Sequence, residues 1–325
     1  MTQNRIDWID YSKTILIIFV VLAHCPFIPS VLDVLICGFH MPAFFIISGY
    51  LHRCQSDNYN CIKKNFKRLI IPALLFSVLC YVFWLLKFLM NNDYSFNECI
   101  LKPILGLFIY DRNVATPICG VIWFLVVLFL CFLLLDFTMH FFKRSGLIIL
   151  ALVFVTITTI FAVSGYKDFQ YGYYLQRTII SFPYVAFGFL CHEYNLFRRQ
   201  KYNFIVACVF TMIYFFLAIY NGHVGIHSYT FGKSVFVYWT ASIIGSLALF
   251  HWTWMMKKTP AWIVKISSGT IVILCLHRPL ISLLLHVWGN PYFITAAIMV
   301  LLYPLMSVFN NYLPWFMGRS YSKKD

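Results

Sequence analysis

Residues 14–52 read TILIIFVVLAHCPFIPSVLDVLICGFHMPAFFIISGYLH, two long apolar runs with few polar residues between them. Runs of this length suit helices that cross the hydrocarbon core of a bilayer, which takes about 20 residues each. The pattern differs from the alternating strands of about ten residues that build a membrane β-barrel. The stretch therefore predicts two antiparallel transmembrane helices, at 14–31 and 34–52, in an all-α membrane fold.

The composition of the whole chain agrees with this interpretation. Of its 325 residues, 61% are hydrophobic, 20% are aromatic and 11% are charged, and the mean hydropathy is +0.78. A soluble domain carries about 25% charged residues, so a water-soluble enzyme is excluded, and the apolar excess excludes a disordered chain. Eleven cysteines form no C-x-x-C pair, so neither a disulfide framework nor a zinc site is indicated. The first apolar run follows a polar Arg5–Lys13 stretch and has no cleavage site, so no cleaved signal peptide is expected.

The same pattern continues along the chain and predicts a single membrane domain, residues 1–325, with ten spans. The predicted spans are 14–31, 34–52, 69–90, 117–135, 146–164, 177–191, 202–220, 234–254, 270–288 and 292–313. No internal repeat is visible, so the inverted symmetry that is common in secondary transporters has no support.

The basic residues orient these spans. The chain has 25 Lys and Arg against 11 Asp and Glu, a net charge of +14, and the cations lie between apolar runs. Such charges are typical of cytoplasmic loops rather than of nucleic-acid binding. With the N-terminus inside, the cytoplasmic cations are Arg5, Lys13, Arg53, Lys63, Lys64, Lys67, Arg68, Lys143, Arg144, Arg198, Arg199, Lys201, Lys257, Lys258, Lys265, Arg319, Lys323 and Lys324. Both termini are therefore expected in the cytoplasm, and the loop 91–116 outside, with its apolar Ile100–Tyr110 stretch at the membrane interface.

Polar residues in the first span indicate a functional site. His24 follows Lys13 by eleven residues, and at about 100° per residue this spacing puts both on one helix face, about 16 Å apart along the axis. With Lys13 at the inner interface, His24 is expected near the middle of the membrane. Asp10 lies one turn before Lys13 and is expected to pair with it.

The second span contains His40, Pro42, Ser48 and Gly49. Pro42 removes a backbone hydrogen bond and Gly49 allows a close backbone approach, so a kink around a cavity is expected. His40 is expected at a depth similar to that of His24. Two interpretations stay open: the histidines join helices through hydrogen bonds, or they take part in chemistry.

A neutral imidazole is suited to act as a general base inside a membrane protein, because its ordinary pKa lies near 6.5. It could take a proton from an alcohol that attacks a carbonyl. A cluster of cations, Lys63, Lys64, Lys67 and Arg68, precedes the third span. These charges serve either topology alone or the binding of phosphates. Together the two features predict a phosphate-bearing donor at the cytoplasmic mouth and a base deeper in the membrane.

Three further candidates are Trp123, Glu193 and His277. Trp123 is expected to pack or to anchor the chain at the interface, unless it lines the site. Glu193 is expected to pair with Arg198 or Arg199 rather than to act as a catalytic acid. His277 stands before a charge and a helix breaker within a span and needs a partner or water. No Walker loop, G-x-G-x-x-G, H-E-x-x-H or G-x-S-x-G motif is present, so these chemistries lose support.

These motifs resemble the membrane-bound acyltransferase-3 family. Lys13 and His24 match its pattern of Arg or Lys, ten residues and His, and His40–Gly49 looks like its second-helix signature. The segment Lys64–Pro72 is similar to its basic motif, while Trp123-Phe-Leu and Leu276-His-Arg-Pro279 fit more loosely. The resemblance runs from Arg5 to about Pro314. Lysines stand at 64 and 67 where many members carry arginine, and lysine keeps the charge without bidentate phosphate recognition.

The resemblance implies a ten-helix cell-membrane enzyme that moves an acyl group, usually acetyl, from cytoplasmic acyl-CoA. The acceptor would be a hydroxyl of a surface polysaccharide or a lipid-linked glycan precursor, and no metal would be needed. It implies that His24 is the base, that Lys13, Lys64, Lys67 and Arg68 meet the CoA phosphates, and that Ser48 lines the acyl channel. Asp10, His40, Trp123, Glu193 and His277 would support the site.

Two other classes of function compete with this hypothesis, a secondary transporter and a non-enzymatic membrane scaffold. A transporter more naturally carries paired carboxylates within its spans. Here every acidic residue is expected at or outside a span end, with Asp136 and Glu193 the nearest. A scaffold would not need Lys13 and His24 on one face.

Overall fold

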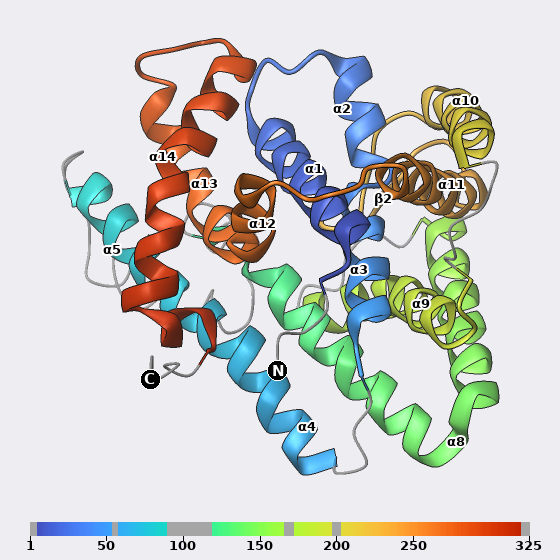
Figure 1. The fold of residues 1–325 in the computed structure, drawn as a ribbon. Coiled ribbons are helices and arrows are strands. Elements are labelled where there is room, and N and C mark those ends of the chain that lie inside the picture. The colour runs from blue at the N-terminus through green and yellow to red at the C-terminus, as the bar shows by residue number, and fades with distance from the viewer. Residues whose placement is uncertain (1–4, 54–57, 90–118, 166–171, 197–202, 320–325) are drawn as a thin grey trace.

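The computed structural model describes residues 5–53, 58–89, 119–165, 172–196 and 203–319. These residues form a bundle of helices with one short β-hairpin (Figure 1). The helices are α1 (Asp7–His24), α2 (Ser30–Cys37), α3 (His40–Leu51), α4 (Asn58–Asn65), the π-helix η1 (Phe66–Ile70), α5 (Ile71–Leu89), α8 (Ile122–Val163), α9 (Tyr173–Glu193), α10 (Asn203–Asn221), α11 (Val235–Trp254), α12 (Ala261–Ser268), α13 (Thr270–Leu284), α14 (Pro291–Tyr312) and the 3₁₀ turn η3 (Pro314–Met317). Strands β1 (Val224–Gly225) and β2 (Thr230–Phe231) pair antiparallel.

Helix α1 lies at the centre of the bundle and packs against α3, α11, α12, α13 and α14. It begins at Asp7 and ends at His24, whereas 14–31 was predicted. The earlier end has a simple cause, because Pro26 and Pro29 follow and proline cannot continue a helix. The helix therefore places His24 in its last turn.

The second predicted span is built from two helices, and its break differs from the expected one. Helices α2 and α3 are separated at Gly38 and Phe39, while the kink was expected near Pro42. Pro42 instead lies in the first turn of α3, where a backbone N–H has no partner within the helix and none is lost. The break brings His40 to the start of α3.

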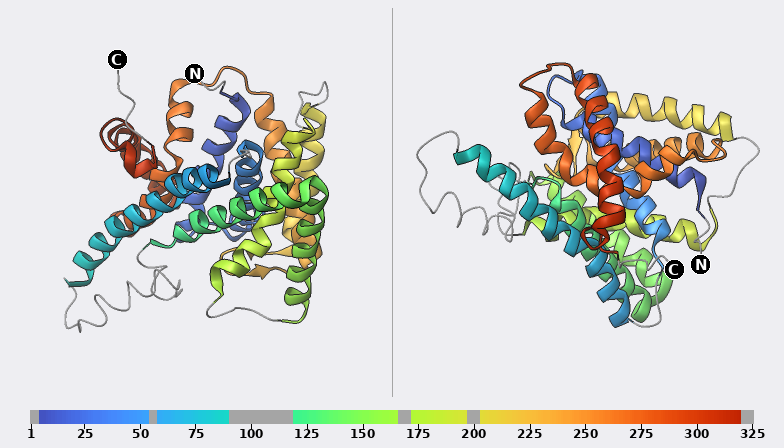
Figure 2. Two further views of the ribbon diagram at one scale, coloured as in Figure 1. Left: turned by 90° about the horizontal axis from the view of Figure 1, so that it is seen from below. Right: turned by 60° about the vertical axis from the view of Figure 1, so that its left-hand side comes forward.

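The basic segment before the third span is helical rather than a loop. Helices α4, η1 and α5 follow one another without interruption, and the amide of Ile71 bonds the carbonyl of Phe66, five residues earlier. Pro72 follows directly, and its ring would clash with a carbonyl held in a normal helical turn. The wider π turn accommodates it. Figure 2 shows this long rod leaving the bundle at its α5 end.

The fourth and fifth predicted spans, 117–135 and 146–164, form the two arms of α8. The backbone of Lys143 leaves the helical region, with φ 54° and ψ −157°, and the helix turns back there (Figure 1). Each arm has about 20 residues and is therefore about 30 Å long, enough to cross the apolar core.

The predicted count of ten spans is not confirmed. Among the described residues, six helices are long and apolar enough to cross a membrane, or seven if the α12–α13 pair, bent by 74°, is one span. Helix α1 differs from these because Asp7, Asp10 and Lys13 interrupt its apolar sequence. The predicted outer loop 91–116 lies outside the described residues.

Large apolar side chains cover the outer helices. Exposed fractions reach 67% at Phe216 of α10, 71% at Val300 of α14 and 61% at Leu152 of α8. Apolar patches of this extent are costly in water but suit contact with lipid. Together with the apolar helices, they identify a protein that resides in a membrane.

Two glycines set the distance between α3 and α9. A Cβ atom at Gly188 would collide with the carbonyl oxygen of Ile46, and one at Gly49 with that of Val185. The two helices therefore touch backbone to backbone, as membrane helices often do at small residues. This contact fixes α3, which carries His40 and Ser48.

We expect Gly188→Ala to destabilise the fold by about 1–3 kcal/mol, because the added methyl group forces α3 and α9 apart. Thermal unfolding of the protein in detergent measures this effect. Gly289→Ala is the matched control, since a Cβ atom there has no neighbour within 4 Å. Equal melting temperatures for the two variants would contradict the close packing.

Candidate functional site

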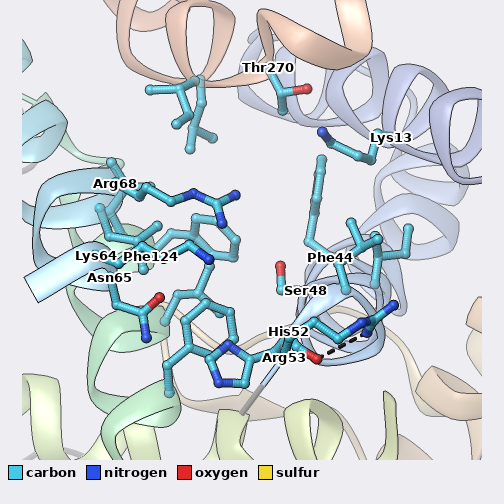
Figure 3. Close-up of a pocket in the computed structure, with 18 of the residues that line it drawn as sticks. Lys13, Phe44, Ser48, His52, Arg53, Lys64, Asn65, Arg68, Phe124 and Thr270 are labelled. Carbon is cyan, nitrogen blue, oxygen red and sulfur yellow. Dashed lines mark hydrogen bonds between the residues drawn. The ribbon is translucent and has the colours of Figure 1, made fainter. Parts of the chain in front are cut away.

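A cavity of about 230 Å³ lies between α1, α3, α4, α8 and α13, and cations line it. The positive side chains are Lys13, Arg53, Lys64 and Arg68, and none of the described lining residues is acidic. Figure 3 shows Lys13 pointing into the cavity from one side and Lys64 and Arg68 from the other, with the Ser48 hydroxyl between them. Such a cavity favours an anion with several charges.

Lys13 is held by the end of α12 rather than by Asp10. Its ammonium donates to the carbonyl oxygen of Ser267 at 2.8 Å. Asp10 accepts instead from Arg5 at 3.2 Å and from the Ser267 hydroxyl at 2.5 Å. The expected direct pair between Asp10 and Lys13 is thus replaced by a bridge through Ser267. Carbonyls at a helix C-terminus attract cations, so the arrangement is favourable.

The basic helix presents two distinct faces. Cys61, Asn65 and Leu69 are buried at intervals of four residues, whereas Lys64 and Arg68, also four residues apart, are exposed, and all five border the cavity. Lys67 is exposed and does not belong to the lining. Of the predicted phosphate ligands, the structure therefore brings Lys13, Lys64 and Arg68 together and leaves Lys67 outside.

Positive charge also gathers just outside this cavity. Arg319 donates to the carbonyl oxygen of Ser268 at 3.2 Å and to the Asn310 side chain at 2.9 Å. Partial burial, followed by the charges of Arg68 and Arg5, lowers the pKa of the Arg319 guanidinium. These cations repel one another, so a bound anion would relieve the repulsion.

A second cavity, of about 170 Å³, lies toward the other end of α1 and is lined by histidines. His24 and His40 border it together with His223 and His227 from the hairpin region. Trp123, which was expected to pack or to anchor, is buried and lines this cavity as well. The structure thus places His24, His40 and Trp123 around one space.

Three histidines share the same anchoring contact. The Nδ1 atoms of His24, His40 and His277 lie 2.7, 2.8 and 3.0 Å from the carbonyl oxygens of Val20, Ile36 and Ile273, each one turn earlier in its helix. Because a carbonyl only accepts, Nδ1 carries the proton in each ring and Nε2 presents a lone pair. His24 is only partly buried, so its lone pair is available to the cavity. This is the tautomer that a general base requires.

His277 lies against His24 but outside the cavity lining. The two ring centroids are 4.8 Å apart at an interplanar angle of 67°. His277 is completely buried, and its Nε2 atom has no hydrogen-bond partner in the described part of the chain. Its neighbour Arg278 borders the cavity. The ring contact between His277 and His24 therefore brings the Leu276–Pro279 motif against the end of α1.

A buried arginine holds the hairpin over the second cavity. Arg177 of α9 is fully buried, stacks on the Tyr173 ring at 4.1 Å and donates to the carbonyl of His227 at 2.7 and 3.2 Å. These contacts fix the turn that carries Ser228 as well as His227. The sequence analysis did not identify this residue, because its partner lies 50 positions away.

The two cavities share three apolar lining residues. Met41, Phe124 and Leu274 border both of them and come from α3, α8 and α13. Lys13 and His24, on one face of α1, border one cavity each, about 16 Å apart along the helix. A slender chain that passed the three apolar side chains would link the cations to the histidines.

The remaining candidate, Glu193, lies away from both cavities. It accepts from Arg144 at 2.5 Å, and its predicted partners Arg198 and Arg199 lie outside the described residues. Asp136, expected just beyond a span end, is buried within α8 and accepts a hydrogen bond from His52 at 2.6 Å. His52 borders the cationic cavity. Neither Asp136 nor His52 was predicted as part of the site.

Comparisons with known proteins identify the family of this chain. The chain is 25% identical over 306 residues to the nodulation protein NolL of Mesorhizobium japonicum. The aligned region covers 84% of this chain and 75% of that protein. No solved structure matches the chain. Residues 6–318, which include both cavities, match the model of the acyltransferase domain family, and the chain belongs to this acyltransferase-3 family of membrane proteins.

Proposed function

We propose that this protein is a membrane O-acyltransferase that moves an acyl group, acetyl above all, from acyl-CoA to a hydroxyl of a cell-surface polysaccharide or a lipid-linked glycan precursor. The observation that carries the proposal is the meeting of a cationic cavity and a histidine-lined cavity at Met41, Phe124 and Leu274. A donor with a charged head and a slender reactive arm suits this shape.

The donor side follows from charge. The phosphates of CoA would bind to Lys13, Lys64 and Arg68, with Arg53 nearby. Of these four cations, the two arginines can form the bidentate contacts that phosphates favour, while the lysines supply charge. The uncharged arm of CoA would extend past Ser48 and then past Met41, Phe124 and Leu274, so its thioester would reach the cavity of His24.

The acyl transfer requires one base. The Nε2 atom of His24 takes the proton of the acceptor hydroxyl while that oxygen attacks the thioester carbonyl. A C–O bond forms, the C–S bond breaks, and the thiolate of CoA leaves with the proton from the imidazolium. The hydrogen bond from Nδ1 to Val20 keeps the ring oriented throughout.

The acceptor would enter from the hairpin side. Ser228, His227 and Arg278 offer hydrogen-bonding groups around the cavity of His24, and the Trp123 ring gives a flat surface on which a sugar can stack. Mass spectrometry of surface glycans from cells with and without the gene tests this part. Loss of acetyl groups upon deletion is expected, and unchanged glycans would contradict a glycan acceptor.

We also propose that the cationic cavity opens to the cytoplasm of a cell-membrane protein with both ends inside. Arg5, Lys13 and Arg319 all contact the segment 264–268, so predicted cytoplasmic cations gather at one end of α1, opposite His24. We expect a cysteine introduced by Lys64→Cys to react with an impermeant maleimide only after the cytoplasmic face is opened. Reaction of this cysteine in intact cells would contradict a cavity that opens to the cytoplasm.

Charge reversal in the cationic cavity should weaken donor binding. We expect Lys64→Glu and Arg68→Glu to raise the apparent KM for acetyl-CoA about tenfold or more, since each removes a charged hydrogen bond to a phosphate. The KM for the acceptor should change little. Lys67→Glu is the matched control, because Lys67 lies on the same helix outside the cavity. Equal effects of all three changes would indicate that the cations serve topology alone.

His24→Gln should abolish transfer and leave donor binding intact. Glutamine keeps hydrogen bonding but has no titratable nitrogen, so the expected loss in kcat is about 10²–10⁴-fold. Acetyl incorporation by membranes with matched amounts of protein measures it, and a binding assay with CoA provides the second readout. Activity near that of the parent protein would leave His24 as a residue that only joins helices.

A further inference from the structure

A buried hydrogen-bonded cluster borders the cationic cavity, and of its four members only Asn65 lies within one of the motifs above. Its centre is Asp136 of α8, which is 6% exposed. One carboxylate oxygen accepts from His52 Nε2 at 2.6 Å, and the other from Cys61 Sγ at 3.0 Å and from the Asn65 amide at 3.5 Å. A buried carboxylate is costly unless it accepts several hydrogen bonds, and here it accepts three.

The cluster joins three separate elements. His52 caps the C-terminus of α3 and stacks on Phe132 of α8, with ring centroids 4.2 Å apart. Cys61 and Asn65 are one turn apart on the buried face of α4. Asp136 thereby ties the end of α3 and the whole of α4 to the first arm of α8.

Three of the four cations of the cavity lie close in the sequence to members of this cluster. Arg53 follows His52 directly, Lys64 stands between Cys61 and Asn65, and Arg68 lies one turn beyond Lys64 on the same continuous helix. A shift of α4 relative to α8 would move the charged groups together. Their positions therefore depend on the hydrogen bonds of Asp136.

We propose that Asp136, His52, Cys61 and Asn65 are positioning residues that hold the phosphate-binding cations in the geometry that acyl-CoA requires. This inference deepens the proposed function and rests on it for the identity of the anion. Asp136 does not line the cavity, whereas His52, Cys61 and Asn65 form part of its wall and direct polar atoms to Asp136. We therefore assign the four residues an effect through Arg53, Lys64 and Arg68.

The observed distances favour hydrogen bonds over a bound metal ion. The ligand atoms of His52, Cys61 and Asp136 lie within 4.8 Å of one another, a set that could hold a divalent cation. However, the two carboxylate oxygens already bond to different donors, at 2.6 and 3.0 Å. A metal ion would have to displace both protons, and the test below includes that outcome.

Asp136→Asn is the central variant, because it keeps the size of the side chain and replaces one acceptor oxygen by the NH2 group of an amide, which only donates. It leaves one of His52 and Cys61 without an acceptor. The expected result is an increase of about tenfold in the dissociation constant of CoA and in the KM for acetyl-CoA. The kcat at saturating donor should stay within about twofold of the parent value, because His24 and its cavity are untouched.

A matched control exists near the other cavity. Asp33 accepts from His223 at 2.6 Å and from Cys37 at 3.3 Å, the same residue types at similar distances. Asp33→Asn therefore removes a contact between the same residue types, although a more exposed one, outside the cationic cavity, and the dissociation constant of CoA should not change. An equal loss of CoA binding in both variants would overturn the proposal.

The reactivity of the Cys61 thiol reports on the position of α4 in a measurement that needs no acyl-CoA. Cys61 is 2% exposed, so a membrane-permeant maleimide followed by peptide mass spectrometry should leave it unlabelled in the parent and label it in Asp136→Asn. Persistent protection together with unchanged CoA binding would overturn the proposal, as would stoichiometric zinc lost upon Cys61→Ser. If the parent fails to bind CoA, the proposed donor is wrong, and Cys61 labelling still decides whether Asp136 positions α4.

Discussion

Polar groups inside an apolar bundle must find partners within the protein, because lipid offers none. This constraint explains the placement of the buried charges. Lys13 donates to a carbonyl oxygen at the C-terminal end of α12, and Arg177 donates to the carbonyl oxygen of His227. Asp136 accepts hydrogen bonds from His52 and from two further donors. Each pairing joins segments that are far apart in the chain. The apolar side chains place the helices in the membrane, while these polar contacts determine which helix ends meet around the two cavities.

The same constraint separates the two chemical environments. Four cations and one imidazole line one cavity, four imidazoles and one cation, Arg278, line the other, and three side chains that border both are apolar. A donor head with several negative charges is therefore favoured on the side of Lys13, Lys64 and Arg68, while its uncharged arm suits the apolar Met41, Phe124 and Leu274. In the proposed reaction, the separation would also keep the thioester from water until an acceptor enters the cavity of His24.

The features that depended on local spacing could be predicted from the sequence. The eleven-residue interval placed Lys13 and His24 on one face of α1, and the apolar runs indicated a helical membrane protein. Features that depended on distant partners could not be predicted. Asp136 and His52 are 84 positions apart, so neither residue carried a local signal, and the bridge through Ser267 in place of an Asp10–Lys13 pair depends on the end of α12. Helix ends were misplaced where proline acts locally, as after His24, and where the backbone leaves the helical region at Phe39, between α2 and α3.

Helix α1 acts as a rigid spacer between the two ends of the proposed reaction. It is continuous from Asp7 to His24, so the interval between Lys13 and His24 fixes a length of about 16 Å and an angular offset of about 20°. One residue more or fewer would turn His24 by about 100° and remove it from the face that Lys13 occupies. The length suits the separation between charged phosphates and a reactive group at the end of an extended arm. In the proposed reaction, this spacing would align His24 with the thioester of a donor whose phosphates are bound three helical turns away.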